Sequence, residues 1–339
     1  MDNQTIIEEI IKNKVTGEVQ VRKYKKGRFI GKIGNNNFIE LTCVDTNKVS
    51  IAKIIDKTTI VKQKAKQRLE NEMSIHRSLQ HSGILTFEHS FETTENVYIL
   101  LERCDNLTLF ELLKRRVRLT ELETMSISMQ IVKSLKYLKS VKLINRNIKL
   151  SNLFISGKME VKIGDFSCSE IIENNGRSRT IYGNPDLMAP ETLDGNIGQS
   201  YEVDIWYLGV VMYTLLVGKQ PFEALDLNET YKRIKANDCT FPNDCIISNS
   251  AKNLIKQMLN CDPQKRPTLD QILSNGFFNN GNFPDFLPEE LLENPPTLDY
   301  IRQFLPNADG NDIYPVNNDF NETFNSISTK ETTNRKDDI

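Results

Sequence analysis

The segment from Asp204 to Val217 limits the possible folds most, because it is apolar on almost every face and contains no lysine or arginine. A helix of this composition is either buried on all sides or lies in a membrane. At about 14 residues it is too short to cross a bilayer, which requires about 20. We therefore predict a buried helix at the centre of a helical region, with Gly218 as its C-cap.

Two kinds of periodicity divide the rest of the chain. Residues 28–60 alternate apolar and polar side chains around turns at Gly34–Asn37 and Asp45–Asn47, which predicts three antiparallel strands. Residues 62–79 have helical spacing, and Thr120–Glu123 has the pattern of a capping box at the start of another helix. The sequence therefore predicts an α+β protein with a β-rich first part and a mostly helical second part.

Composition excludes several classes of protein. The 339 residues are 39% hydrophobic and 26% charged, with a formal net charge of −2, so we expect neither nucleic-acid nor membrane binding. No apolar run is long enough for a membrane span, and the N-terminus lacks the features of a signal peptide. We expect a cytoplasmic or nuclear protein. None of the six cysteines forms a C-x-x-C pair, which argues against a zinc ribbon.

The two ends of the chain differ in composition from the middle. Residues 1–23 are polar, and we expect an extension of marginal order there. Residues 280–339 are rich in Asn and Pro. We expect this tail to be mostly disordered, because it cannot bury enough apolar surface to offset the entropy of ordering.

Two short motifs carry the functional information. Residues 143–152 read L-I-N-R-N-I-K-L-S-N, and residues 164–167 read G-D-F-S. Together they resemble the H-R-D-x-K-x-x-N catalytic loop and the D-F-G turn of protein kinases. The resemblance implies a bilobal protein-kinase fold over residues 24–279, with an N-lobe over 24–102 and a C-lobe over 103–279.

Within the kinases, the chain is most similar to the polo-like family. The segments that carry this similarity are Gly27–Lys32, Ser74–Leu79, Leu112–Arg116, Val161–Phe166, Glu202–Trp206 and Leu215–Phe222. Members of that family are Ser/Thr kinases of cell division, and their C-terminal polo boxes dock phosphorylated partners. Because the sequence ends soon after residue 279, we expect a kinase domain without polo boxes.

The resemblance implies a site for ATP and Mg²⁺. The residues matched to nucleotide binding are Ile30, Gly31, Gly34, Phe38, Ala52, Lys53, Glu72, Leu101, Glu102, Cys104 and Phe154. Those matched to metal binding are Asn152 and Asp165, those matched to catalysis are Asn147, Lys149 and Asn184, and those matched to regulation are Arg146 and Thr180.

Lys53 also has a physical argument of its own. It lies in the apolar run Ile-Ala-Lys-Ile-Ile, which predicts a mostly buried strand. An unpaired ammonium group would be costly there, so we predict an ion pair with Glu72 on the following helix. The alternative is that both side chains are solvated surface charges.

Asn147 stands where kinases have the aspartate that acts as the base. An amide cannot accept a proton as a carboxylate does, although its oxygen can still orient a hydroxyl group. General-base assistance is typically worth about 10²–10⁴-fold in rate, so this residue predicts a severe loss of phosphotransfer. The alternative is a kinase of its own lineage that tolerates the change.

Other positions depart from the kinase pattern as well. Asn145 replaces the histidine of the catalytic loop, Asn184 replaces a threonine, Ile33 replaces the central glycine of the phosphate loop, and Ser167 replaces the glycine of D-F-G. We predict that Ile33, Asn145, Asn147 and Asn184 converge on one small volume.

The positions that support the kinase scaffold are intact. Ala189–Glu191 matches the A-P-E motif, for which Arg266 is the expected ion-pair partner, and Asp204 matches the residue that anchors the catalytic loop. Thr180 resembles an activation-loop phosphorylation site, at which a phosphate could pair with Arg146. The alternative for Thr180 is an ordinary exposed threonine.

Three functional hypotheses follow. The first is a polo-like pseudokinase that binds Mg-ATP, has lost or much reduced phosphotransfer, and acts in signalling or cell-cycle regulation. The second is a slow but genuine Ser/Thr kinase that uses ATP and Mg²⁺ on protein substrates. The third is an interaction module without a nucleotide site, for which Ile33 is the best support. We expect a monomer with protein substrates or protein partners.

Overall fold

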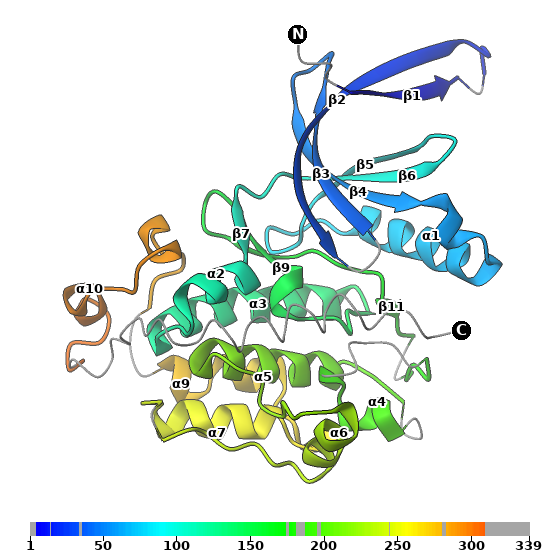
Figure 1. Ribbon diagram of the computed structural model, residues 1–339. Helices are drawn as coiled ribbons and strands as arrows, with labels where there is room; N and C mark the ends of the chain where they lie inside the picture. The colour runs from blue at the N-terminus through cyan, green and yellow to red at the C-terminus, as the bar shows by residue number, and fades with distance from the viewer. Residues whose placement is uncertain are drawn as a thin grey trace. The chain divides into compact units, whose positions relative to one another are not determined.

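The computed structural model describes residues 5–13, 15–33, 36–173, 176–180, 187–194, 198–243, 245–279 and 283–308. The chain divides into two compact units. The first contains the described residues up to Gln80 together with Leu85–Cys104, and the second contains His81–Ile84 and the described residues from Asp105 onward. The first unit is dominated by an antiparallel sheet and the second by helices, which confirms the predicted α+β class (Figure 1).

The first unit is a six-stranded sheet with one long helix (Figure 1). Its elements are β1 (Ile6–Lys12), β2 (Val19–Ile33), β3 (Asn36–Cys43), β4 (Val49–Asp56), the 3₁₀ helix η1 (Lys57–Ile60), α1 (Gln63–Ser78), β5 (Phe87–Glu92) and β6 (Asn96–Leu101). The strand order is β1-β2-β3-β4-β6-β5, and every neighbouring pair is antiparallel. The predicted strands over 28–60 and the helix over 62–79 are therefore confirmed.

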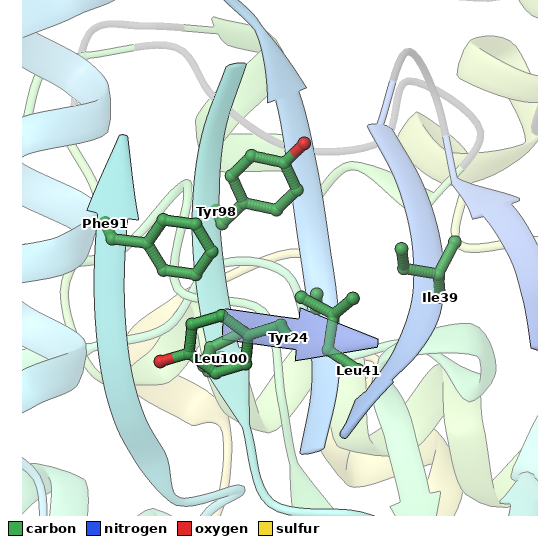
Figure 2. Close-up of a cluster of buried hydrophobic side chains, with 7 residues drawn as sticks. Tyr24, Ile39, Leu41, Phe91, Tyr98 and Leu100 are labelled. Carbon is green, nitrogen blue, oxygen red and sulfur yellow. The ribbon is translucent and has the colours of Figure 1, made fainter. Parts of the chain in front are cut away.

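Aromatic rings fill the core of this sheet. Tyr24 stacks on Phe91 with ring centroids 5.0 Å apart, and Phe91 stacks on Tyr98 at 4.7 Å. Ile39 and Leu41 from β3 are buried in the same cluster (Figure 2). These rings come from β2, β5 and β6, so the core joins strands from both ends of the strand order.

The N-terminal extension differs from our expectation. Residues 6–12 form β1, which pairs with β2 from Ile6 opposite Lys25 to Lys12 opposite Val19. Glu9 is buried on the inner side of this strand, where its carboxylate accepts a hydrogen bond from the Tyr24 hydroxyl at 3.0 Å. Ladder hydrogen bonds and a satisfied buried carboxylate order this part of a segment for which we expected marginal order.

The second unit contains most of the helices. Its elements are β7 (Asn106–Thr108), α2 (Leu109–Arg116), α3 (Glu121–Ser140), β8 (Leu143–Ile144), the 3₁₀ helix η2 (Leu150–Asn152), β9 (Leu153–Ile155), β10 (Val161–Ile163), β11 (Glu170–Ile171), α4 (Pro190–Asp194), α5 (Glu202–Val217), α6 (Leu227–Lys235), α7 (Asn249–Met258), η4 (Pro263–Lys265), α8 (Leu269–Leu273), α9 (Gly276–Asn279), η5 (Glu289–Leu292) and α10 (Leu298–Arg302).

Helix α5 is the buried helix that its composition predicts. Every residue from Val203 to Val217 is buried, and α5 packs against α3 and α7 (Figure 1). Gly218 ends the helix with a φ of 86°, a left-handed conformation that glycine adopts without strain. The capping box at Thr120 and Glu123 also forms at the start of α3.

The C-terminal tail is more ordered than we expected over residues 283–308. These residues contain η5 and α10, and Ile301 is buried against Leu122 of α3. The buried guanidinium of Arg116 donates hydrogen bonds to Glu123 and to the carbonyl oxygen of Leu291. A few apolar anchors therefore hold a segment whose average composition predicts disorder. Residues 309–339 lie outside the described part of the chain.

Within the described residues, no helix combines the length and apolar character needed to cross a membrane.

Candidate active site

The first unit contributes a buried ion pair. Lys53 lies on β4 between Phe38 of β3 and Ile99 of β6, so its strand is in the middle of the sheet. Its Nζ atom is 2.5 Å from Oε1 of Glu72, which α1 presents. Only 10% of the Lys53 side chain and 9% of the Glu72 side chain are exposed. The predicted pair is present, and each charge compensates the other in a position where neither could stand alone.

The residues matched to adenine binding lie at the end of β6 and on β4. Leu101 and Ala52 are buried. Beyond β6, the Glu102 N–H donates to the carbonyl oxygen of Thr86 at 3.0 Å, and the Glu102 carboxylate accepts from the Thr86 N–H at 2.7 Å. These two hydrogen bonds hold the backbone at Glu102 against Thr86, two residues before Cys104. Adenine binding by the Glu102 and Cys104 backbone remains a prediction.

The phosphate-loop residues are only partly described. Gly31 pairs with Phe38 across β2 and β3, and a Cβ atom added at Gly31 would meet nothing within 4 Å. Space next to this glycine is what a loop that covers phosphates needs. Ile30 is 44% exposed. Gly34, the Ile33 side chain and Asn184 lie outside the described residues, so the predicted convergence of Ile33 and Asn184 with the catalytic loop remains a prediction.

In the second unit, a short hairpin brings the two predicted metal ligands together. Strands β9 and β10 are antiparallel, with Leu153 opposite Ile163. Asn152, just before β9, and Gly164, just after β10, therefore lie at the same end of the hairpin. The Gly164 N–H donates to the carbonyl oxygen of Asn152 at 3.0 Å, and Asp165 is the next residue. Phe154, the predicted adenine contact from this unit, lies on β9 and is half-buried.

The loop before this hairpin is anchored on α5 by a buried carboxylate. Asp204 accepts the N–H of Asn145 at 2.8 Å and the N–H of Arg146 at 2.7 Å. Arg146 has a φ of 62°, a strained value for an arginine, and these two hydrogen bonds hold the backbone in it. Burial raises the pKa of Asp204 to about 6, and the two N–H donors and the Arg146 charge oppose that rise.

The asparagines of the catalytic loop surround Asp165. Asn147 donates from Nδ2 to Oδ2 of Asp165 at 2.8 Å, and Asn145 donates from Nδ2 to the Asp165 carbonyl oxygen at 3.0 Å. The Asn145 Oδ1 atom accepts the Asn147 N–H at 3.0 Å. The other Asp165 oxygen, Oδ1, accepts the Ser167 N–H at 3.0 Å. The two substituted positions therefore form one amide network that orients a predicted metal ligand.

The donor set fits a hard cation. Asn152 donates from Nδ2 to the carbonyl oxygen of Asn147 at 2.9 Å, which presents its amide oxygen as the ligand atom. With Asp165 this gives two oxygen ligands, the kind that Mg²⁺ prefers when phosphates complete its coordination. Among the described residues, no group of three or more His, Cys, Asp or Glu side chains could hold a metal ion without such help.

The predicted regulatory pair is also in contact. Arg146 donates from one guanidinium nitrogen to the Thr180 hydroxyl at 3.1 Å. The same nitrogen contacts the Ser178 hydroxyl at 2.8 Å and the Glu170 carboxylate at 3.0 Å. Sequence analysis missed Glu170 and Ser178, because nothing in their spacing shows that they share a partner with Arg146.

A second buried ion pair supports the helical unit. Arg266 binds Glu191 through two nitrogen–oxygen contacts of 2.6 Å each, as the A-P-E motif predicts. The Arg266 guanidinium also lies 5.1 Å from the ring centroid of Trp206. The pair is almost completely buried and bidentate, so it holds Glu191 of α4 firmly against Arg266, which precedes α8. Arg266 also donates to the carbonyl oxygen of Glu202, the first residue of α5.

Comparisons with known proteins agree with this fold. The model of the family "Protein kinase domain" matches residues 24–278. The probable serine/threonine-protein kinase CCRP1 of Zea mays is 49% identical over 306 residues, which cover 90% of this chain and 49% of the relative. The probable kinase PLK of Dictyostelium discoideum is 44% identical and the kinase PLK1 of Xenopus laevis is 44% identical, over 84% and 81% of this chain.

These matches define a protein-kinase domain, and the chain belongs to the polo-like Ser/Thr protein kinase family. It spans about half the length, or less, of these curated relatives: 49%, 29% and 46%.

Proposed function

We propose that this chain binds Mg-ATP in a polo-like kinase fold, has lost or much reduced phosphotransfer, and acts in signalling or cell-cycle regulation through protein partners. The observation that carries this proposal is the contact of Asn147 with Asp165. The Asn147 amide nitrogen donates to the Asp165 carboxylate at 2.8 Å, so the side chain in the base position is a donor engaged with its neighbour. It has no group that can take a proton from a substrate hydroxyl.

The rest of the site supports nucleotide binding. Lys53, oriented by Glu72, would hold phosphate oxygens, and Asn152 with Asp165 would hold Mg²⁺. When bound, Mg²⁺ neutralises phosphate charge. Lys149, at the N-cap of η2, is half-buried and would lie beside the terminal phosphate. Positioning and charge compensation therefore remain while proton acceptance is missing.

A second candidate function is a slow but active Ser/Thr kinase. The intact Lys53–Glu72 pair and the oriented Asn152 favour it, because phosphoryl transfer depends mainly on positioning and electrostatics. It predicts that Asn147→Asp raises the rate of transfer about 10²–10⁴-fold without changing the affinity for ATP. Under the proposed function, transfer by the unmodified chain stays at the level of an Asp165→Ala variant.

Nucleotide binding is tested by thermal unfolding with and without Mg-ATP. At 100 times its Kd, a ligand stabilises the native state by about 2.7 kcal/mol, so the melting temperature should rise. Asp165→Ala should remove this rise, whereas Asp285→Ala, which removes an exposed carboxylate of the same unit, should keep it. No rise in the unmodified protein at millimolar Mg-ATP would contradict both candidate functions and support an interaction module without a nucleotide site.

A further inference from the structure

The guanidinium of Arg146 is buried and needs an anion. Arg146 is only 1% exposed. Its Nε atom donates to the carbonyl oxygen of Cys168 at 2.7 Å, and one terminal nitrogen contacts the hydroxyls of Ser178 and Thr180. These partners are neutral. The nearby carboxylate of Asp204 accepts the backbone N–H groups of Asn145 and Arg146 with its two oxygens.

The carboxylate of Glu170 contacts the guanidinium. This residue lies on β11 and pairs with Ile144, the last residue of β8. Arg146 follows two residues after Ile144, in the loop beyond the strand. Its Oε2 atom is 3.0 Å from the Arg146 nitrogen and accepts hydrogen bonds from the Ser178 hydroxyl at 2.6 Å and the Thr180 hydroxyl at 2.9 Å. One carboxylate oxygen thus joins the arginine to the segment 176–180.

We propose that Glu170 is a positioning residue that supplies from within the chain the anion required by Arg146, so that the segment 176–180 is held in place without phosphorylation of Thr180. Backbone bonds complete the attachment. The Ser178 N–H donates to the Gln199 carbonyl oxygen at 2.8 Å, and the Gln199 N–H donates back to Ser178 at 2.7 Å. The cluster therefore connects the catalytic loop, β11 and this segment in the unmodified protein.

The same geometry reverses the usual effect of a phosphate. A phosphate on Thr180 would carry a charge of about −1.5 to −2. The Thr180 hydroxyl oxygen to which it would be attached lies 2.9 Å from the Glu170 carboxylate. Two anions would compete for one buried arginine, and like charges at this distance repel. Phosphorylation at Thr180 should therefore displace Glu170 and loosen the segment rather than order it.

This inference takes Thr180 as the candidate phosphorylation site from the sequence and does not otherwise rest on the proposed function. It concerns residues that do not contact nucleotide in the proposed site, and its test needs neither ATP nor phosphotransfer. If the protein proves to be an active kinase or to bind no nucleotide, the contacts of Glu170 are unaffected.

The test is limited trypsin digestion of the full chain, with cleavage after Arg177 and Arg179 followed by mass spectrometry. The variants are Glu170→Gln, Thr180→Glu and the double variant. The control is Glu173→Gln, which removes one exposed carboxylate from the same stretch of chain. Hydrogen exchange at the Ser178 and Gln199 amides gives the same comparison without a protease, and thermal unfolding checks that each variant is folded.

Glu170→Gln should speed cleavage about tenfold or more relative to the control, because a charge-assisted contact is lost and cleavage follows the population of the open segment. Thr180→Glu alone should also speed cleavage. The double variant should be cleaved more slowly than either single variant, because the new carboxylate takes the vacated position. Cleavage of Glu170→Gln at the control rate, or protection by Thr180→Glu alone, would overturn the inference.

Discussion

At the scale of single residues, Asn147 differs from an aspartate by one amide group, and that group faces a carboxylate. The hydrogen bond to Asp165 is possible because the amide nitrogen is a donor. An aspartate at the same place would present a carboxylate oxygen to a carboxylate oxygen. The asparagine therefore stabilises the turn at Asp165, the predicted metal ligand, without help from a cation.

This contact predicts a metal-dependent effect of Asn147→Asp. Without a divalent cation, two like charges within hydrogen-bond distance should lower the free energy of unfolding by about 1–3 kcal/mol. Thermal unfolding in EDTA and in millimolar Mg²⁺ measures this effect, and Mg²⁺ should restore most of the loss.

Asn253→Asp, at an exposed position of α7, is the control and should respond little to either condition. Equal melting temperatures for Asn147→Asp and the unmodified protein in EDTA would show that the contact with Asp165 does not matter for stability.

Asp204 makes a second prediction at this scale. Its pKa is about 6 in the folded chain and ordinarily 3.8, because burial disfavours the charged form. The stability contributed by its protonation is fully present below about pH 3.8 and is lost as the pH rises through about 6. The carboxyl ¹³C shift of Asp204 in NMR spectra should therefore titrate with a midpoint near 6. A midpoint near 4 would mean that the two N–H donors and Arg146 offset the whole effect of burial.

At the scale of elements, β1 shows how a charged residue can belong to the inner face of a sheet. Glu9 is 6% exposed and lies 2.6 Å from Nε2 of His89 on β5 as well as 3.0 Å from the Tyr24 hydroxyl on β2. This carboxylate links the first strand of the sheet to the last one in the strand order. Burial also raises the pKa of Tyr24 to about 12, so the tyrosine stays a hydrogen-bond donor at neutral pH.

We therefore expect Glu9→Ala to destabilise the protein by about 1–3 kcal/mol, since it removes the hydrogen-bond acceptor of the buried Tyr24 hydroxyl and the partner of His89. Glu8→Ala removes an exposed carboxylate one position away, whose contact with Lys23 is 3.4 Å long, and should change stability by less than about 0.5 kcal/mol. Urea unfolding of the two variants measures the difference. Equal effects would mean that β1 is held by its backbone ladder alone.

The elements also show where sequence analysis succeeds and where it fails. Composition and capping residues predict α5 and α3 because each signal is local. The pattern I-I-E-E-I-I-K hides the strand alternation of β1, because buried Glu9 occupies a position where an apolar residue would be expected. The tail over 283–308 escapes prediction for a related reason: its anchors, such as Leu291 and Ile301, are too sparse to raise the average hydrophobicity.

The same limit applies to the site. The pairs Lys53–Glu72 and Arg266–Glu191 could be predicted, because each partner has its own motif position. The contacts of Glu170 could not, because they join residues up to 24 positions apart that share no motif. The hydrogen bond from Asn147 to Asp165 could not be predicted either. The sequence shows that residue 147 is an amide, but not which group the amide contacts.

At the scale of the whole molecule, a protein-kinase domain has an asparagine, Asn147, at the position matched to the carboxylate base. Helix α5, the Arg266–Glu191 pair and the loop anchor Asp204 preserve the helical unit, and the Lys53–Glu72 pair preserves the sheet unit. The described departures from the kinase pattern concentrate around Asp165. We therefore predict that the protein folds and binds nucleotide as a kinase does but transfers little or no phosphate.

The most direct test of this claim is the transfer of labelled phosphate from Mg-ATP to a generic acidic protein, with the purified chain and its Asp165→Ala variant side by side. We predict the same background signal from both proteins, while only the unmodified chain is stabilised by Mg-ATP. A signal from the unmodified chain that disappears in Asp165→Ala would contradict this prediction and identify a working Ser/Thr kinase that functions with Asn147.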